Sequence, residues 1–231
     1  MRLMKSKAEN GNMNVAIEKA RYVVIDTELT GLNEKKDSIV SIGAVRMEGG
    51  RIEMGDSFYR LVNPGSDLTA ASVVIHEIMP SEVRTEPEIS GVLEQFREFC
   101  GHDVIVGYCV SIDMDFLNSE SRRLFRRPFE NQVVDIQPLF EWMVSRGIFP
   151  WKGEMTSPRQ YRLYDLAKNF DIAVNGGHNA MIDAFITAQV FQRFIPVLIK
   201  AGIRGTEELV KMSKNFRGGD RFIHSGGISN F

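Results

Sequence analysis

The stretch that decides the fold is Tyr22-Val23-Val24-Ile25-Asp26-Thr27-Glu28-Leu29-Thr30-Gly31-Leu32. Its apolar half predicts a strand over residues 22–26, with two acids on alternate positions at the end of that strand. Because side chains alternate between the two faces of a strand, Asp26 and Glu28 are expected to project to the same side. Two carboxylates placed in this way repel each other, and a shared cation relieves that repulsion.

Three further polar residues lie at the ends of expected elements. Asp113 follows the apolar run at residues 104–106 after a short connection, which is where many α/β sheets bind ligands. Far downstream, His178 and Asp183 form an H-x-x-x-x-D run that opens an apolar helix, and an acid on such a helix needs a partner or a cation. Taken singly, an acid at a strand end or His178 at a helix start is more typical of a helix cap or a surface position, whereas Asp183 within an apolar helix is more informative. Together, four acids and one histidine favour a two-metal phosphodiesterase.

Composition limits the class of protein without indicating a substrate. The 231 residues are 43% hydrophobic and 25% charged, as in an ordinary globular chain with one sizeable core. The formal net charge of −2 is weak evidence against nucleic-acid binding, because a metal-charged site binds phosphates without a basic protein. Cys100 and Cys109 are too few for a disulfide scaffold. With no signal-peptide core and no apolar stretch of roughly 20 residues, we expect a cytoplasmic protein with no membrane partner.

Turn signals and hydrophobic periodicity predict alternating elements. Strands are expected at residues 22–26, 39–47 and 58–62. A helix should then start at a capping box of Thr85 and Glu88 and end at Gly101. The later elements are expected to be a strand at 104–106, a helix at 112–124, a strand at 133–136, a helix at 139–146, a loop at 149–160, a helix at 163–170 and a long helix from His178 that Pro196 ends or kinks. An antiparallel three-strand meander followed by helix–strand alternation predicts an α/β fold with a mixed five-stranded sheet flanked by helices.

Three stretches resemble the motifs of the DEDDh 3′–5′ exonucleases, the DnaQ-like family that includes the proofreading epsilon subunit of bacterial DNA polymerase III. Residues 24–32 resemble the first motif, residues 106–117 the second, with Asp113 as its acid, and residues 178–184 the third. Between them, Val62-Asn63-Pro64 and Ile75-His76-Glu77-Ile78 also look like this family. Any one motif is weak, but three in order over roughly residues 22–195 are highly specific.

This resemblance implies a ribonuclease H-like fold and a metal-dependent 3′–5′ exonuclease. Two ions, Mg²⁺ or Mn²⁺, would be shared by four acids: Asp26, Glu28, Asp113 and Asp183. His178 would accept the proton of the attacking water. The substrate would be a single-stranded 3′ end of DNA or RNA, and the product a 5′-nucleoside monophosphate.

The resemblance also implies a pocket for the terminal nucleotide, formed by Leu29, Thr30, Leu32, His76 and Ile112. Ordinary packing explains the three aliphatic residues equally well. The chain departs from the family near this pocket, and these departures leave the substrate preference open. The family usually has His-Asn at Tyr108-Cys109, an aromatic residue at Ile112 and often Gly at Glu77.

Two basic stretches have competing explanations. Four arginines after the second motif favour a solvated helix face over the alternative, a phosphate track: Arg122, Arg123, Arg126 and Arg127. Trp151, with Lys152 and Arg159, either stacks on single strands or caps the core.

Two classes of function follow from these observations. The first is the exonuclease, with DNA proofreading, RNA trimming and oligoribonucleotide clearance all open, because no residue is identified that reads the 2′-OH. The second is a catalytically weak nucleic-acid-binding or polymerase-associated module of the same fold, and the intact set of five residues argues against it. A DNA polymerase subunit is the expected protein partner in a proofreading role. We expect a polar lead-in at residues 1–20, an exonuclease domain at 21–214 and a Gly-rich polar tail at 215–231.

Overall fold

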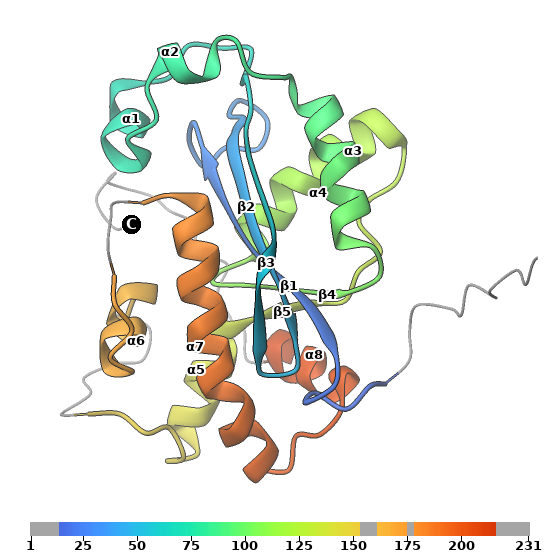
Figure 1. Cartoon of the computed structure of the whole chain (residues 1–231), viewed down its shortest axis with the longest axis vertical. Coiled ribbons are helices and arrows are strands. Elements are labelled where there is room, and N and C mark those ends of the chain that lie inside the picture. Colours follow the sequence, from blue (N-terminus) through green and yellow to red (C-terminus); the bar gives the residue numbers. More distant parts are fainter. Residues whose placement is uncertain (1–13, 153–160, 175–177, 216–231) are drawn as a thin grey trace, which may run out of the picture.

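A mixed five-stranded sheet lies at the centre of the computed structural model, which describes residues 14–152, 161–174 and 178–215 (Figure 1). The strand order is β3-β2-β1-β4-β5. The strands are β1 Arg21–Leu29, β2 Ile39–Glu48, β3 Arg51–Leu61, β4 Val104–Gly107 and β5 Val133–Asp135. The first three form an antiparallel meander, and β4 and β5 run parallel to β1. The predicted fold class is confirmed.

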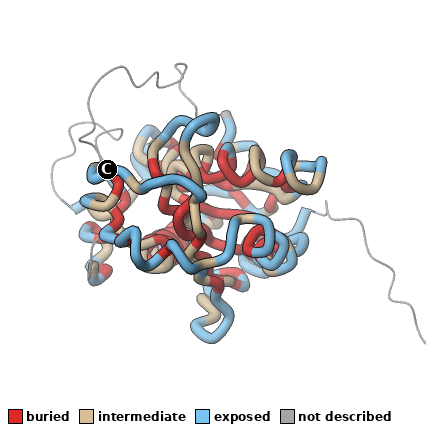
Figure 2. The backbone as a smooth tube through the Cα atoms, turned by 90° about the horizontal axis from the view of Figure 1, so that it is seen from above, coloured by how far each residue is buried: buried red, intermediate tan, exposed pale blue. Residues whose placement is uncertain are grey.

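Helices cover both faces of this sheet. They are α1 Ala70–His76, α2 Pro80–Val83, α3 Ile89–Cys100, α4 Ser111–Phe125, α5 Ile136–Ser145, α6 Leu163–Asn169, α7 Ala180–Lys200 and α8 Thr206–Asn215. The long helix α7 crosses one face, and α3 and α4 lie on the other (Figure 1). Figure 2 shows the buried backbone between these layers.

Successive side chains of β1 point to opposite faces of the sheet and are buried in two different hydrophobic clusters. Tyr22 and Val24 are buried with the apolar side of α7, whereas Val23 and Ile25 are buried with α3 and α4. A central strand covered on both faces reads as a continuous apolar run, as this one does. Continuing the alternation places Asp26 on the α7 side of the sheet.

The helix after the meander starts later than the sequence predicts. The N-cap of α3 is Glu88, and Thr85 lies in the preceding turn, so the predicted capping box is wrong. The reason is tertiary: the Asn63 N–H donates to the Pro87 carbonyl, and Asn63 forms a bridge with Glu88. These contacts hold residues 87–88 extended beside the end of β3. The short helices α1 and α2 precede α3, in a segment where the sequence predicts no clear element.

Helix α7 continues past Pro196 to Lys200, so of the two predicted effects of Pro196 the helix end is wrong, and the kink stays a prediction. Ile195 and Leu198 on either side are buried in the core, and this packing outweighs the backbone hydrogen bond that a proline lacks. By length and composition α7 could cross a membrane, but more than half of its apolar stretch is buried inside the fold. Its apolar character is explained by the sheet that it covers.

Residues just before β1 pack against the domain. Ile17 is fully buried, its carbonyl accepts a hydrogen bond from the Tyr22 hydroxyl, and Ala16 forms a bridge with Gly205. The predicted domain boundaries at residues 20 and 214 stay predictions, although these contacts tie residues 15–17 to the fold.

Candidate active site

Asp26 and Glu28 lie where β1 extends beyond its parallel neighbour. The pairing with β4 covers only Tyr22 to Val24, whereas β2 pairs with β1 as far as Leu29. The strand is therefore longer than predicted, and the two acids lie within it, past the end of β4. This leaves room beside them for residues from other elements.

Helix α7 brings Asp183 to these acids. Its N-cap is Asn179, whose side-chain carbonyl accepts hydrogen bonds from the backbone N–H groups of Met181 and Ile182. Opposite the helix start, β2 carries Gly43, and a Cβ atom there would lie 2.2 Å from the carbonyl carbon of Ala180. Only glycine allows β2 and α7 to approach this closely. Asp183 is consequently held in the first turn of α7, facing β1.

Three carboxylates converge as a result. Asp26, Glu28 and Asp183 each offer an oxygen, and these oxygens all lie within 4.8 Å of one another. All-oxygen donor sets of this kind suit hard divalent cations such as Mg²⁺ and Mn²⁺. The residues present therefore fit the predicted metal ions.

Asp113 adjoins this group from the opposite layer. It lies in the first turn of α4, is 6% exposed, and accepts a 2.6 Å hydrogen bond from the Thr27 hydroxyl. Thr27 projects to the α4 side of β1 and binds this carboxylate, which lies outside the 4.8 Å group. Among the neighbouring acids, the negative charge of Asp113 raises the pKa of Asp26 the most.

Burial and mutual repulsion raise the pKa values of these acids. Burial, followed by the charges of Asp183 and Asp113, raises the pKa of Glu28 to about 8. Burial raises the pKa of Asp113 to about 7 against the lowering effect of the Thr27 hydrogen bond. The pKa of Asp26 is raised well above its ordinary value, first by burial and then by its acidic neighbours. A divalent cation removes this repulsion.

His178 lies at the rim of the acidic group, just before the start of α7. Its Nδ1 is 3.6 Å from Asp183 Oδ2, and a third of its side chain is exposed. Tyr164 of α6 contacts both residues, since its hydroxyl donates a 2.7 Å hydrogen bond to Asp183 Oδ1 and its ring stacks on the imidazole. Tyr164 is not predicted from the sequence, since no local spacing indicates it: the contact depends on how α6 packs against α7.

Of the residues predicted to form the nucleotide pocket, one has an exposed side chain and several are packed into the fold. Leu32 is 47% exposed. Leu29 and Ile112 are half-buried against the core of α3 and α4, so the structure supports the packing explanation for both. The Thr30 hydroxyl donates to Asp37 and accepts from the Ser38 N–H, which closes the loop after β1. Their substrate contacts stay predictions.

His76 differs from the other predicted pocket residues because it has an unused polar atom. Its Nδ1 accepts a hydrogen bond from the Ile78 N–H, so the ring proton is on Nε2. Within the described residues, this buried Nε2 has no hydrogen-bond partner. A buried donor without a partner is costly, and a substrate oxygen would satisfy it.

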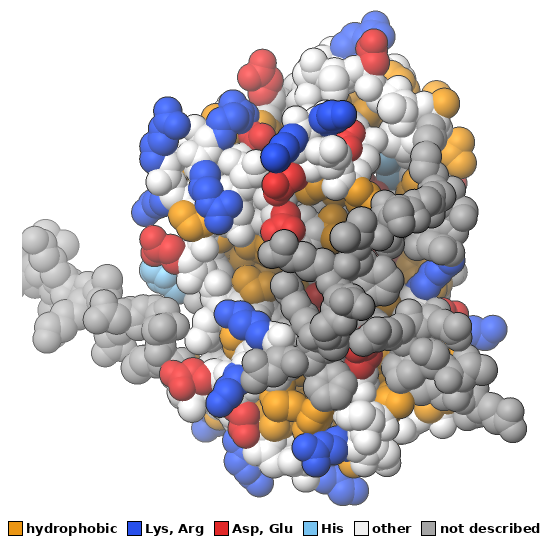
Figure 3. All heavy atoms as spheres, turned by 180° about the vertical axis from the view of Figure 1, so that it is seen from behind, with side chains coloured by type: hydrophobic (Ala, Val, Ile, Leu, Met, Phe, Trp, Pro, Cys, Tyr) orange, Lys and Arg blue, Asp and Glu red, His pale blue; other side chains and the backbone are white. Residues whose placement is uncertain are grey.

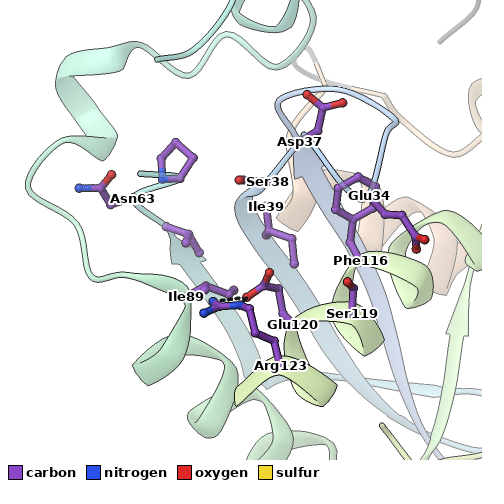
Figure 4. A pocket seen from close by; sticks show the side chains of 12 residues that line it. Glu34, Asp37, Ser38, Ile39, Asn63, Ile89, Phe116, Ser119, Glu120 and Arg123 are labelled. Atoms are coloured by element: carbon purple, nitrogen blue, oxygen red, sulfur yellow. Dashed lines mark hydrogen bonds and ion pairs between the residues drawn. The ribbon is translucent and has the colours of Figure 1, made fainter. Parts of the chain in front are cut away.

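The structure favours the packing explanation for Trp151, and both explanations of the exposed arginine run stay predictions. The four arginines of the basic run are exposed at the end of α4, and Arg123 pairs with Glu120 beside a pocket outside the acidic group (Figure 4). Figure 3 shows basic and acidic side chains interspersed on the face opposite that of Figure 1. Trp151 packs against Phe140 and Tyr161 as a capping aromatic. Arg159 lies outside the described residues.

The chain is similar to a known protein family. A family model described as "Exonuclease" matches residues 23–191. This chain belongs to the exonuclease family. The predicted family resemblance and the predicted enzyme class, a 3′–5′ exonuclease, are thereby confirmed at the level of the family.

Relatives of this exonuclease include a DNA polymerase III subunit and a PolC-type DNA polymerase III. It is 31% identical to the DNA polymerase III subunit epsilon of Aquifex aeolicus over 91% of this chain and 98% of that protein. It is 32% identical to the PolC-type DNA polymerase III of Listeria innocua, of which it covers 12%. The fold is similar to that of E. coli exonuclease I in complex with a dT13 oligonucleotide, with a TM-score of 0.69 and 19% identity over 80% of this chain and 43% of that one.

Proposed function

We propose that this exonuclease hydrolyses single-stranded nucleic acid from a free 3′ end and releases 5′-nucleoside monophosphates. The observation that carries the proposal is the convergence of three carboxylates from β1 and α7, with Asp113 beside them. The four acids would hold two Mg²⁺ or Mn²⁺ ions. When bound, such ions lower the pKa of an attacking water and stabilise the leaving 3′ oxygen.

The remaining residues would act on the proton and on the substrate. His178 has Nδ1 directed at Asp183, which leaves Nε2 to accept the proton of the attacking water. His76 Nε2–H would donate to an oxygen of the terminal nucleotide. Leu32 would pack against the last base through its exposed side chain, with Leu29, Thr30 and Ile112 completing the pocket.

Proofreading of DNA with a polymerase partner is the role we favour within this activity. Its support is the relationship to polymerase III epsilon, which this chain matches over 98% of that protein's length. The same relationship supports a cytoplasmic location. RNA trimming and a catalytically weak module of the same fold are the alternatives.

The first prediction tests the reaction directly. Single-stranded DNA and RNA labelled at the 5′ end are incubated with the protein and Mn²⁺ or Mg²⁺, and the products are resolved by length. The wild type should shorten strands from the 3′ end. Asp26→Asn should abolish shortening, and His178→Ala should slow it by about 10²–10⁴-fold, the usual contribution of a general base.

Asp56→Asn is the matched control, because Asp56 is an exposed carboxylate paired with Arg46 on the sheet surface. It should degrade the strands at the wild-type rate. Wild-type protein that retains the labelled strand without shortening it would favour the binding module. Undiminished cleavage by Asp26→Asn would contradict the proposed site.

A further inference from the structure

Tyr164 contacts two members of the candidate site at once. It lies in α6, packs half-buried against the main core, and reaches Asp183 on α7 and His178 just before that helix. We propose that Tyr164 is a positioning residue whose hydroxyl orients the metal ligand Asp183 and whose ring orients the base His178. This inference rests on the proposed function, which supplies the roles of those two residues.

The hydroxyl acts on Asp183. Its 2.7 Å hydrogen bond to Oδ1 is charge-assisted when the carboxylate is ionised, so it is stronger than a neutral one. Asp183 is 6% exposed, and a buried carboxylate with one oxygen fixed in this way has few other orientations. The second oxygen, Oδ2, then faces His178. Partners that orient a metal-binding carboxylate typically change metal affinity or activity by about 10–100-fold when removed.

The ring acts on His178. His178 precedes the N-cap Asn179, so the helical backbone does not fix its position. The 3.6 Å separation of Nδ1 from Asp183 Oδ2 is too long for a strong hydrogen bond. Among the described residues, Tyr164 stacks on this ring, with ring centroids 5.3 Å apart and an interplanar angle of 27°. Without the ring, the imidazole gains rotamers that do not direct a nitrogen at the attacking water.

Two substitutions separate these contributions. Tyr164→Phe removes the hydroxyl and keeps the ring, whereas Tyr164→Leu removes both. Mn²⁺ binding to the intact chain is measured by titration calorimetry and by the metal-induced rise in Tm. Both variants should bind Mn²⁺ about 10-fold more weakly than wild type. At saturating Mn²⁺, Tyr164→Phe should recover a kcat close to wild type, and Tyr164→Leu should stay at least about 10-fold lower with an unchanged KM.

The same pair in a His178→Ala background tests whether the ring acts through the imidazole. There, Phe and Leu at position 164 should give equal kcat values, because the ring has no base to orient. Tyr22→Phe is the matched control: it also removes a tyrosine hydroxyl, one bonded to a backbone carbonyl at 2.8 Å. It should lower stability and leave Mn²⁺ binding unchanged.

Wild-type Mn²⁺ affinity in Tyr164→Phe would overturn the role of the hydroxyl. A Phe-to-Leu difference that persists in the His178→Ala background would overturn the role of the ring, since a structural effect alone would produce it. If the wild-type protein shortens no strand, the proposed function fails instead. The calorimetric result still decides the hydroxyl's role in that case.

Discussion

Two residues at which the chain departs from its family have a left-handed backbone. Glu77 has φ of 57° and Cys109 has φ of 50°. A left-handed conformation costs a non-glycine residue roughly 1–2 kcal/mol, and glycine and asparagine tolerate it best. The family residues expected at these positions, Gly and Asn, are therefore the ones that the backbone favours. The departures carry a cost in stability while leaving every acid of the site in place.

Replacing Glu77 should remove one such cost. Glu77 is the C-cap of α1, where its N–H donates to the Val73 carbonyl, and Glu77→Gly keeps that bond. We expect Glu77→Gly to stabilise the protein by about 0.5–1 kcal/mol, the strain relieved minus the entropy that glycine adds to the unfolded chain. Urea denaturation measures this change. Glu77→Ala keeps the strain and should give no gain; an equal gain from alanine would show that backbone conformation is not the cause.

The acids of the site could be predicted from the sequence, and their supports could not. Asp26 and Glu28 follow from strand alternation, and His178 and Asp183 from their spacing at a helix start, which are local rules. Tyr164 acts across 19 residues of chain through the packing of α6 on α7. The spacing of residues in the sequence does not predict such a contact.

At the scale of elements, the close approach of β2 and α7 decides where Asp183 lies. Gly43 pairs with Asp26 across the sheet and abuts the backbone of Ala180 on α7. The sequence showed Gly43 only as one residue within an apolar strand. The start of α3 could not be predicted for a similar reason. Asn63, which is distant in sequence, holds residues 87–88 extended.

Adding one methyl group at Gly43 should therefore damage the site. The new Cβ would lie 2.2 Å from the Ala180 carbonyl carbon, which forces α7 away from the sheet. We expect Gly43→Ala to lower stability by roughly 1–3 kcal/mol and exonuclease kcat by about 10²-fold, since a shift near 1 Å has that effect on a reacting geometry. Gly91→Ala in α3 is the control, because nothing lies within 4 Å of its Cβ. It should retain kcat and gain about 0.5–1 kcal/mol of stability. Unchanged kcat in Gly43→Ala would mean that the close approach does not position Asp183.

At the scale of the whole molecule, the acidic group couples folding to pH. The folded chain raises the pKa of Glu28 from 4.5 to about 8 and that of Asp113 from 3.8 to about 7, mainly by burial. Between about pH 4 and pH 8 the folded state thus holds protons that the unfolded state has released. Stability contributed by these groups is present at low pH and falls as pH rises through this window. The fold stores electrostatic repulsion at the position where the cations are proposed to bind.

We therefore expect metal-free protein to lose stability between pH 5 and pH 8.5, as measured by urea denaturation in EDTA. Glu28→Gln removes one of the raised pKa values and should show a smaller loss over the same range. Mn²⁺ at pH 8.5 should restore stability to the wild type, because a cation that binds only the folded state stabilises it in proportion to the logarithm of its concentration over Kd. The restoration should be smaller in Glu28→Gln, which has lost a charged ligand. A metal-free wild type whose stability rises with pH, or a variant that loses as much as wild type, would show that the buried acids are not the source of the coupling.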